Sequence, residues 1–250
     1  MSRKAQKRAE ATVPRSVPAK AAKPRERASL NREVIIAAAL AEIDRSGLEN
    51  FSLRNLAKAL GVFPTAIAWY VPGRSRLLAE VARKALEDVI PRGFHDSWQG
   101  YIRDFLHRFR ESIRRHPNVA PLIGSLVGNP MVDLEFVERL LAALAHAGLS
   151  GARLVAAYNA IIAAAVGFTT QEFASMPEEG TADWQEEIRD RLKNVPEIRY
   201  PQLAKNMKLL GNKAFTLRWQ NGIEAPMDAS FDAFVGIFIL GLEQFAAQTA

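Results

Sequence analysis

Four basic side chains and no acidic one lie between residues 52 and 76. The four are Arg54, Lys58, Arg74 and Arg76. Cations at this density can neutralise the phosphates of a nucleic acid, which favours binding through the release of counterions. The same spacing also suits a solvated helical hairpin that binds nothing, so charge and spacing alone leave both interpretations open.

Two short helices joined at Gly61 are expected to carry these charges. Ser52 is a favourable N-cap for the first helix, Gly61 tolerates the positive φ of a tight turn, and Pro64 lacks an N–H group where the second helix needs none. Ile67 is expected to be the buried anchor of the second helix, which leaves its opposite face free to enter a major groove. The pattern from Ser52 to Tyr70 therefore predicts a helix-turn-helix.

The composition excludes several classes of chemistry. The chain has 250 residues, 48% of them hydrophobic, which is enough for a sizeable core, and it has no cysteine. Disulfides, thiolate metal sites and cysteine nucleophiles are therefore excluded, and the missing cysteines fit a reducing compartment, so a cytoplasmic location is expected. The four histidines, at positions 95, 107, 116 and 146, show no metal-ligand spacing with an acidic residue, so no metal or other cofactor is expected.

No residue pattern indicates a catalytic site, and we do not expect an enzyme. A Gly-rich phosphate loop and a His–carboxylate cluster are both missing from the sequence. Ser125, in the run from Gly124 to Gly128, superficially resembles a nucleophile motif, but no strand is expected before it.

The N-terminal 30 residues carry almost all of the excess positive charge. The net charge of the whole chain is +6, whereas residues 1–30 hold nine Lys/Arg and two Glu, which gives +7. Three prolines and few large apolar residues predict that this tail is disordered, because it cannot bury enough surface to offset the entropy of ordering. It is either a solubilising arm or a non-specific phosphate-binding arm, and Glu10 and Glu26 argue against a transit peptide.

The remaining chain reads as a string of helices, because apolar residues recur at helical spacing and strand signals are nearly absent. Helices are expected over residues 31–46, 53–60, 64–70, 74–90, 98–115, 117–126, 132–147, 151–174 and 228–246. Residues 175–226 show only weak and interrupted helical spacing. The longest apolar runs, 154–168 and 233–242, are shorter than the roughly 20 residues that a bilayer needs, so no membrane span is expected.

A family resemblance favours one of these interpretations. Residues 34–78 resemble, without a gap, the DNA-binding domain of the TetR family of bacterial transcriptional regulators. The residues that carry this resemblance are Phe51-Ser52-Leu53-Arg54-Asn55-Leu56-Ala57-Lys58-Ala59-Leu60-Gly61-Val62, Pro64-Thr65-Ala66-Ile67, Trp69-Tyr70-Val71 and Arg74-Ser75-Arg76-Leu77-Leu78. Further motifs resemble the ligand-binding domain of tetracycline-repressor-like members, among them Trp98-Gln99, Arg115-His116-Pro117 and Val166-Gly167-Phe168. The resemblance spans about residues 31–174 and 228–245.

The resemblance implies an all-α protein in which residues 31–76 form a three-helix DNA-binding domain with a helix-turn-helix. Residues 77–250 would form a larger helical domain that binds a small-molecule effector and forms a homodimer. The implied function is transcriptional regulation by a repressor that leaves its double-stranded operator DNA when the effector binds.

Two departures from the family keep another interpretation open. Phe63 stands where a small polar N-cap is usual, which places the start of the recognition helix in doubt, and Ala68 stands where a phosphate-binding Tyr is usual. A helical ligand-binding protein with weak or lost DNA binding is therefore the alternative, and an enzyme is a more distant one.

The resemblance also assigns roles to single residues. Ser52 would cap the first helix of the motif and contact phosphate, Arg54 would reach a base edge or a phosphate, and Arg74 would bind phosphate. The residues expected at the DNA are Ser52, Arg54, Thr65, Ala66, Trp69, Tyr70 and Arg74.

Effector and dimer contacts are expected in the larger domain. The candidates for an effector pocket are Phe105, Phe109, Ile123, Tyr158 and Phe173. Small side chains let helices pack closely, and the resemblance pairs such a helix with the aromatic last helix of the chain. The candidates for the dimer interface are Ala156, Ala160, Ala164, Gly167, Phe234 and Phe238. A purely intramolecular core is the alternative for these helices. Ile90 and Ile123 occupy the places of the histidines with which tetracycline repressors hold a magnesium–drug complex, so tetracycline itself is not expected as the effector.

Overall fold

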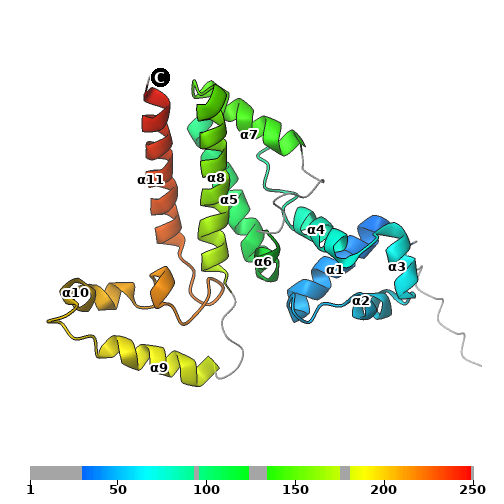
Figure 1. Ribbon diagram of the computed structural model, residues 1–250, viewed down its shortest axis with the longest axis horizontal. Helices are drawn as coiled ribbons and strands as arrows, with labels where there is room; N and C mark the ends of the chain where they lie inside the picture. Colours follow the sequence, from blue (N-terminus) through cyan, green and yellow to red (C-terminus); the bar gives the residue numbers. More distant parts are fainter. Residues whose placement is uncertain (1–29, 93–95, 124–133, 175–180, 249–250) are drawn as a thin grey trace, which may run out of the picture. The chain divides into compact units, whose positions relative to one another are not determined.

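The computed structural model describes residues 30–92, 96–123, 134–174 and 181–248. By its internal contacts the chain divides into two units, Met1–Leu30 and Asn31–Ala250. The first unit, which contains the basic tail, lies outside the described residues except for Leu30. All regular secondary structure in the described ranges is helical, which confirms the prediction of an all-α fold (Figure 1).

Four short helices form the N-terminal part of the second unit: α1 (Arg32–Ser46), α2 (Leu53–Leu60), α3 (Pro64–Tyr70) and α4 (Arg74–Ala85). α1 packs against α2 and α4, and α2 packs against α3. Their core consists of almost fully buried side chains, among them Ile35, Ile43, Leu56, Ile67 and Leu77. The full burial of one such side chain contributes about 1.5–3 kcal/mol relative to exposure, so this small part has its own apolar core.

α4 ends earlier than predicted. The sequence predicted a helix from Arg74 to Ile90, but α4 ends at Ala85, and Leu86 has left the helical conformation (φ −98°, ψ 11°). The hydroxyl of Ser112, from a helix farther along the chain, donates a hydrogen bond to the Ala85 carbonyl and so satisfies one of the acceptors at the helix end. The prediction was wrong because the contact at this end comes from a distant segment.

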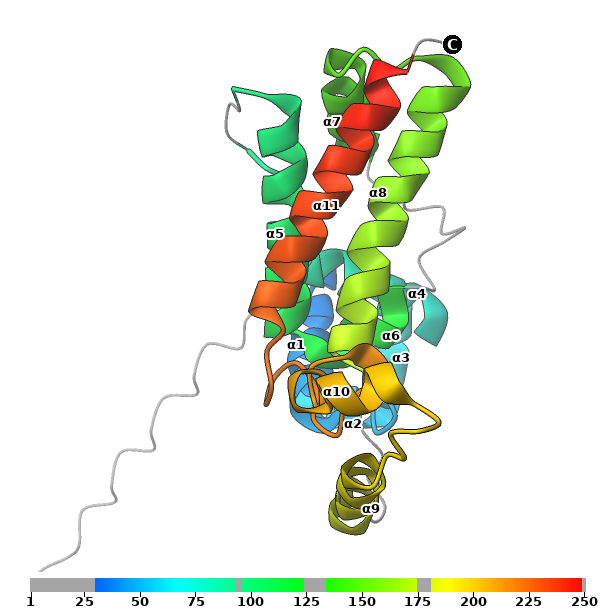
Figure 2. The same ribbon diagram turned by 90° about the vertical axis from the view of Figure 1, so that its left-hand side faces the viewer.

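The larger part contains α5 (Trp98–Arg115), α7 (Leu134–His146), α8 (Gly151–Glu172) and α11 (Asp228–Ala247). α5 contacts α7, α8 and α11, and α8 and α11 run side by side in both views (Figure 1, Figure 2). Aromatic contacts join these two helices, because the ring centroid of Phe168 lies 5.1 Å from those of Phe231 and Phe234.

Two short elements connect the two parts. They are the 3₁₀ turn η1 (Pro117–Val119) and α6 (Ala120–Ile123). η1 contacts α1, α4 and α5, whereas α6 contacts α4 and α8. The sequence predicted one helix over residues 117–126 in this place, and residues 124–126 lie outside the described residues, as do residues 132 and 133 of the helix predicted over 132–147.

The region after α8 is more helical than predicted. It contains α9 (Thr181–Lys193), α10 (Pro201–Leu210) and the 3₁₀ turn η3 (Phe215–Leu217). A helix is predicted from apolar residues that recur on the face it buries. No residue of α10 is buried, so this helix has no such face.

α8 and α11 are long and apolar enough to cross a membrane by length and composition alone. Their mean hydropathies over 18 residues are 1.5 and 1.4, and 22% of each of these stretches is buried within the protein. The sequence expectation of no span rested on unbroken apolar runs, and both helices extend beyond those runs.

Candidate nucleic-acid interface

The turn between α2 and α3 has the geometry that the sequence predicted. Ser52 caps α2, because its Oγ accepts a hydrogen bond from the Asn55 N–H at 3.1 Å. Gly61 lies in the left-handed region (φ 67°, ψ 33°), which glycine adopts without strain. The N–H of Val62 donates to the Ala57 carbonyl at 3.0 Å and closes the end of α2. The two helices are therefore joined as a helix-turn-helix.

α3 buries one side chain and exposes the opposite face. Ile67 is 1% exposed and anchors α3, as predicted. At 100° per residue, Thr65 and Trp69 lie opposite Ile67, and both are exposed, Trp69 at 79%. Trp69 makes an edge-to-face contact with Tyr70 at 4.7 Å between ring centroids. The face predicted to enter a major groove is therefore open to solvent in the isolated chain.

Phe63 precedes α3 without capping it through its side chain. Its backbone is extended (φ −80°, ψ 148°), and its ring is 82% exposed. α3 forms nevertheless, because Pro64 supplies a helical φ at the first position and has no N–H group to satisfy. The Ala66 N–H donates to the Phe63 carbonyl at 2.9 Å. The departure from the family pattern thus changes what the turn presents to solvent and leaves the helix in place.

Four exposed cations flank α3 in the sequence. They are Arg54, Lys58, Arg74 and Arg76. Within the described residues none of the four forms a salt bridge, whereas Arg32 and Arg83 both pair with the buried Glu80. The Arg74 guanidinium lies 5.9 Å from the centroid of the Phe51 ring, a cation–π contact at the start of α4. The four charges are therefore available to a polyanion.

Six of the seven residues predicted at the DNA lie on α2, on α3 or at their ends, and the seventh, Arg74, begins α4. The exposed members are Arg54, Thr65, Trp69 and Arg74, and the half-buried members are Ser52, Ala66 and Tyr70. Ala68 is also exposed, so the position that usually carries a phosphate-binding hydroxyl has none.

The segment from α5 to α6 holds the C-terminal end of α1. His116 Nδ1 lies 2.8 Å from Asp44 Oδ2, and the Asn118 amide donates to the carbonyls of Ile43 and Asp44, both at 3.1 Å. This pair could not be predicted from local spacing, because His116 and Asp44 are 72 residues apart. The two parts of the unit are therefore joined by polar contacts as well as by packing.

The five candidates for an effector pocket do not all meet. Phe105, Phe109, Ile123 and Phe173 are buried, and the Phe105 ring centroid lies 6.1 Å from that of Phe109. Tyr158 is half-buried on α8, and its burial raises the pKa of its hydroxyl. Tyr158 and Phe173 are 15 residues apart along α8 and its C-cap, about 22 Å at the rise of a helix, so one small pocket cannot contain both.

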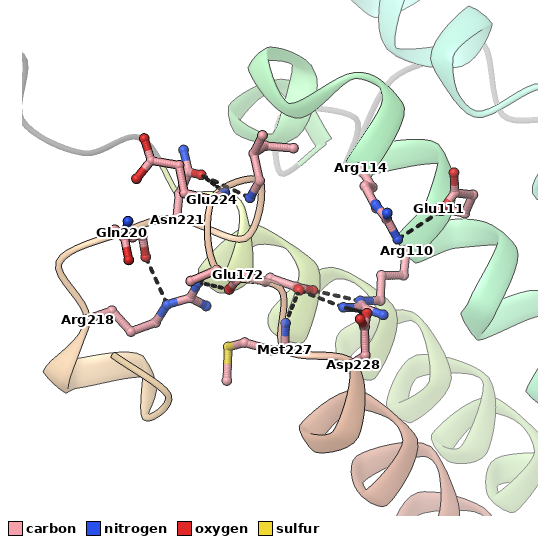
Figure 3. Close-up of polar contacts among 12 residues, drawn as sticks. Arg110, Glu111, Arg114, Glu172, Arg218, Gln220, Asn221, Glu224, Met227 and Asp228 are labelled. Carbon is pink, nitrogen blue, oxygen red and sulfur yellow. Dashed lines mark hydrogen bonds and ion pairs between the residues drawn. The ribbon is translucent and has the colours of Figure 1, made fainter. Parts of the chain in front are cut away.

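A buried acid organises the C-terminal end of α8. Glu172 is 0% exposed and accepts hydrogen bonds from Arg110 Nε and Nη2, both at 2.7 Å, and from the Met227 N–H at 3.0 Å (Figure 3). Arg110 also pairs with Asp228 at 2.8 Å. Burial acts to lower the pKa of Arg110, but the hydrogen bonds with Glu172 and Asp228 outweigh it and raise the pKa above its usual value. These four residues, the Glu172 cluster, tie α5, α8 and α11 together.

The chain between α10 and α11 closes over this cluster. The Gly222 N–H donates to the Glu172 carbonyl at 2.7 Å, and a Cβ at Gly222 would lie 2.5 Å from Glu172 Cγ, so a side chain does not fit. Arg218 is buried beside it and donates to the carbonyls of Gln220 and Ala225. Its Nη1 has no hydrogen-bond partner in the described part of the chain. Burial lowers the pKa of Arg218, and the charge of Glu172 opposes this shift.

A groove of about 330 Å³ lies between α9 and α10. Its lining consists of Arg189, Leu192, Lys193, Met207, Lys208, Gly211 and Trp219. The Arg189 guanidinium lies 5.4 Å from the centroid of the Trp219 ring. None of the five candidates for the effector pocket lines this groove.

α8 and α11 present apolar side chains to solvent. Ile237 and Leu240 of α11 are 72% and 65% exposed, and Val155 of α8 is also exposed. The residues predicted for the dimer interface lie on the same two helices. Ala156 and Ala160 are exposed, and the half-buried ones are Ala164, Gly167, Phe234 and Phe238.

The described residues contain no group of three or more His, Asp or Glu side chains that could hold a metal ion. His107 Nε2 approaches Asp232 at 3.9 Å on the surface. His95 and Ser125 lie outside the described residues.

A known protein family has a domain that matches the larger part of this chain. The family model described as the tetracyclin repressor-like C-terminal domain matches residues 90–225, more than half of the chain. The match extends through residues 175–225, so the prediction that this stretch lies outside the family resemblance was wrong.

Individual relatives agree with the family model. An HTH-type transcriptional regulator of Saccharopolyspora erythraea is 31% identical over 184 residues, which cover 71% of this chain and 75% of that protein. The class C tetracycline repressor of Escherichia coli is 26% identical over 225 residues, 88% of this chain and 94% of that protein. The structure of the TetR family protein ActR of Streptomyces coelicolor with actinorhodin has the same fold, with a TM-score of 0.70 at 20% identity over 89% of this chain and 100% of that one. The chain therefore belongs to the TetR family of transcriptional regulators.

Proposed function

We propose that this regulator is a repressor that binds double-stranded operator DNA through α3 and leaves it when a small-molecule effector binds. The observation that carries the proposal is the open face of α3 between four cations that have no salt-bridge partner in the described residues. Phosphate contacts from such cations fix the register of a protein on DNA, and side chains in the groove read the bases. Residues 31–76 would be the DNA-binding domain, and the protein would act in the cytoplasm.

The second part of the proposal is a homodimer formed through α8 and α11. Ile237 and Leu240 leave a large apolar area in solvent on α11, beside a face of α8 that is rich in alanine. A second copy that covers both helices would form a four-helix interface with Ala156, Ala160, Ala164, Gly167, Phe234 and Phe238. The same area could instead contact a membrane, but the paired recognition helices of a dimer suit a two-fold operator, so we favour the dimer.

The third part concerns the effector and its route to the DNA. ActR was solved with actinorhodin bound, which supports an effector site in the corresponding domain, residues 77–250. We place its lining among Phe105, Phe109, Ile123 and Tyr158, on α5, α6 and α8. α6 contacts both α8 and α4, so a ligand that displaces α6 would move α4 and the attached α3. Phe173 is the C-cap of α8, about 22 Å along the helix from Tyr158, and we leave it out of this pocket.

A mobility-shift titration tests the function. The full chain is titrated onto the DNA upstream of its own gene and onto random DNA of equal length, at two salt concentrations. A specific regulator shifts the upstream fragment at a concentration at least about 1,000-fold lower than random DNA. Equal affinity for the two fragments, or no shift of either, would contradict the proposal and favour a ligand-binding protein without an operator.

A further inference from the structure

The recognition surface of α3 lacks the side chains that read a purine through two hydrogen bonds. From Phe63 to Val71 the sequence has no Arg, Lys, Asn or Gln, and it has no Asp or Glu. The side chains in this stretch that can form hydrogen bonds are Thr65, Trp69 and Tyr70. The large apolar side chains that α3 and its N-cap expose are both aromatic, Phe63 at 82% and Trp69 at 79%.

The chemistry of the major groove restricts what such a surface can read. Arg and Lys recognise guanine, Asn and Gln recognise adenine, Asp and Glu accept from cytosine, and apolar side chains contact the 5-methyl group of thymine. Only the thymine contact is available to the ring carbons of both Phe63 and Trp69. Removal of this aromatic surface from water against a methyl group is favourable without any hydrogen bond.

The two aromatic side chains are placed for this contact. The N-terminal residues of a recognition helix contact base edges, and Phe63 lies immediately before the first turn of α3. Trp69 lies opposite the buried anchor Ile67, on the face that also carries Thr65. The surrounding cations would hold the helix on the phosphates without reading sequence.

We propose that Phe63 and Trp69 are specificity-determining residues that recognise thymine 5-methyl groups, so that the operator carries thymines where α3 enters the groove. The inference rests on the proposed function, because it presupposes that α3 binds operator DNA. It goes further by stating which base is read and by which chemical group.

Uracil substitution in the operator tests this inference. Each thymine of the bound fragment is replaced singly by uracil, which deletes the 5-methyl group and keeps the base pair. Binding should weaken about fourfold at each contacted thymine, the value of one buried methyl group, and should be unchanged elsewhere. If every uracil fragment binds like the parent, the inference is wrong while the proposed function stands. If the protein binds no operator at all, both fail.

Two variants and one control assign the effect to side chains. Trp69→Ala and Phe63→Ser should each remove the uracil effect at some of the sensitive positions. Phe63→Ser also provides a small polar N-cap, so α3 should remain folded, which circular dichroism checks. Ile198→Ala, at an apolar side chain that is fully exposed outside α3, should leave the uracil effect unchanged. Retention of the full parental pattern in both variants would assign thymine recognition to other residues and overturn the inference.

Discussion

The helix-turn-helix of α2 and α3 and the Glu172 cluster use polar side chains in opposite ways. In the helix-turn-helix, Ser52 bonds an amide three residues away, and Arg54 leaves its charge in solvent. In the cluster, Glu172 bonds Arg110, 62 residues earlier, and the amide of Met227, 55 residues later, with no accessible surface of its own. The helix-turn-helix keeps its charges available to a partner, whereas the cluster uses its charges within the protein.

This difference predicts which measurement each variant will change. Loss of a charge from the helix-turn-helix should alter DNA binding and leave the free energy of unfolding almost unchanged, because exposed charges contribute little to stability. Loss of Glu172 from the cluster should lower the free energy of unfolding, because the buried Arg110 then keeps only its pair with the largely exposed Asp228. The following variants test that separation, from the largest expected effect to the smallest.

Glu172→Ala should lower the free energy of unfolding by about 3–5 kcal/mol, because Arg110 would keep its burial and lose its bidentate partner. Urea unfolding followed by circular dichroism measures the change. Asp190→Ala is the matched control, because it removes one partner of an exposed pair, Lys193–Asp190 at 2.8 Å, and should cost less than about 1 kcal/mol. Equal and small losses in both variants would mean that the cluster does not stabilise the fold.

Leu240→Asp should convert the proposed dimer into a monomer. The substitution places a carboxylate in each copy where the other copy would bury it without a partner. Burial of an unpaired neutral group costs roughly 1–3 kcal/mol, and burial of an unpaired charge costs more. Sedimentation at micromolar concentration measures the change. Ile198→Asp, at an exposed apolar residue outside α8 and α11, should leave the mass unchanged. A monomeric parent protein that floats with lipid vesicles would contradict the dimer and favour membrane contact.

Arg54→Ala and Arg74→Ala should weaken operator binding by different routes. Arg74 should act on phosphate, so its loss lowers affinity for all sequences and reduces the slope of log affinity against log salt by about one unit. Arg54 at a base edge should cost about 1–3 kcal/mol and relax the preference at one position. Titrations on operator and random DNA over a salt series distinguish the two. Identical slopes and unchanged base preference in both variants would contradict the assignment.

The same contrast explains how much of the fold the sequence predicted. The helix-turn-helix follows from signals within a few residues of one another, namely the cap at Ser52, the left-handed turn at Gly61, the proline at Pro64 and the anchor at Ile67, and all four were confirmed. The end of α4 was predicted wrongly, because it coincides with a hydrogen bond from Ser112. Local spacing carries no information about such a partner.

The candidate sites differ in the same way, since some consist of residues close in sequence and others of residues from distant segments. The seven residues predicted at the DNA are close in sequence, on α2, α3 and the start of α4, and their relative placement within each helix follows from helix geometry. The pocket candidates come from several helices, and residue type alone could not show which of them meet in the fold. The Glu172 cluster was missed for the same reason, since a single acid near a helix end gives no sign of an arginine 62 residues away.

Loss of a helix cap has the smallest expected effect. Because a cap acts only on its own helix end, it should contribute equally to the free energy of unfolding in the N-terminal part and in the larger part. Asn31 caps α1 at 2.9 Å and Ser97 caps α5 at 3.1 Å. Asn31→Ala and Ser97→Ala should each lower the free energy of unfolding by about 1 kcal/mol, since each leaves one helical N–H without its acceptor.

Ser150 provides the control for these caps. It occupies the same position before α8 with an extended backbone, but its side chain makes no capping hydrogen bond. Ser150→Ala should therefore change stability by less than about 0.5 kcal/mol, as for a surface substitution without a specific contact. Thermal unfolding of the three variants side by side makes the measurement. If Ser150→Ala lowers the free energy of unfolding as much as the other two variants do, the loss comes from replacing a polar residue before a helix and not from breaking the capping hydrogen bond. The cap signals used to predict the helices would then have a different physical origin.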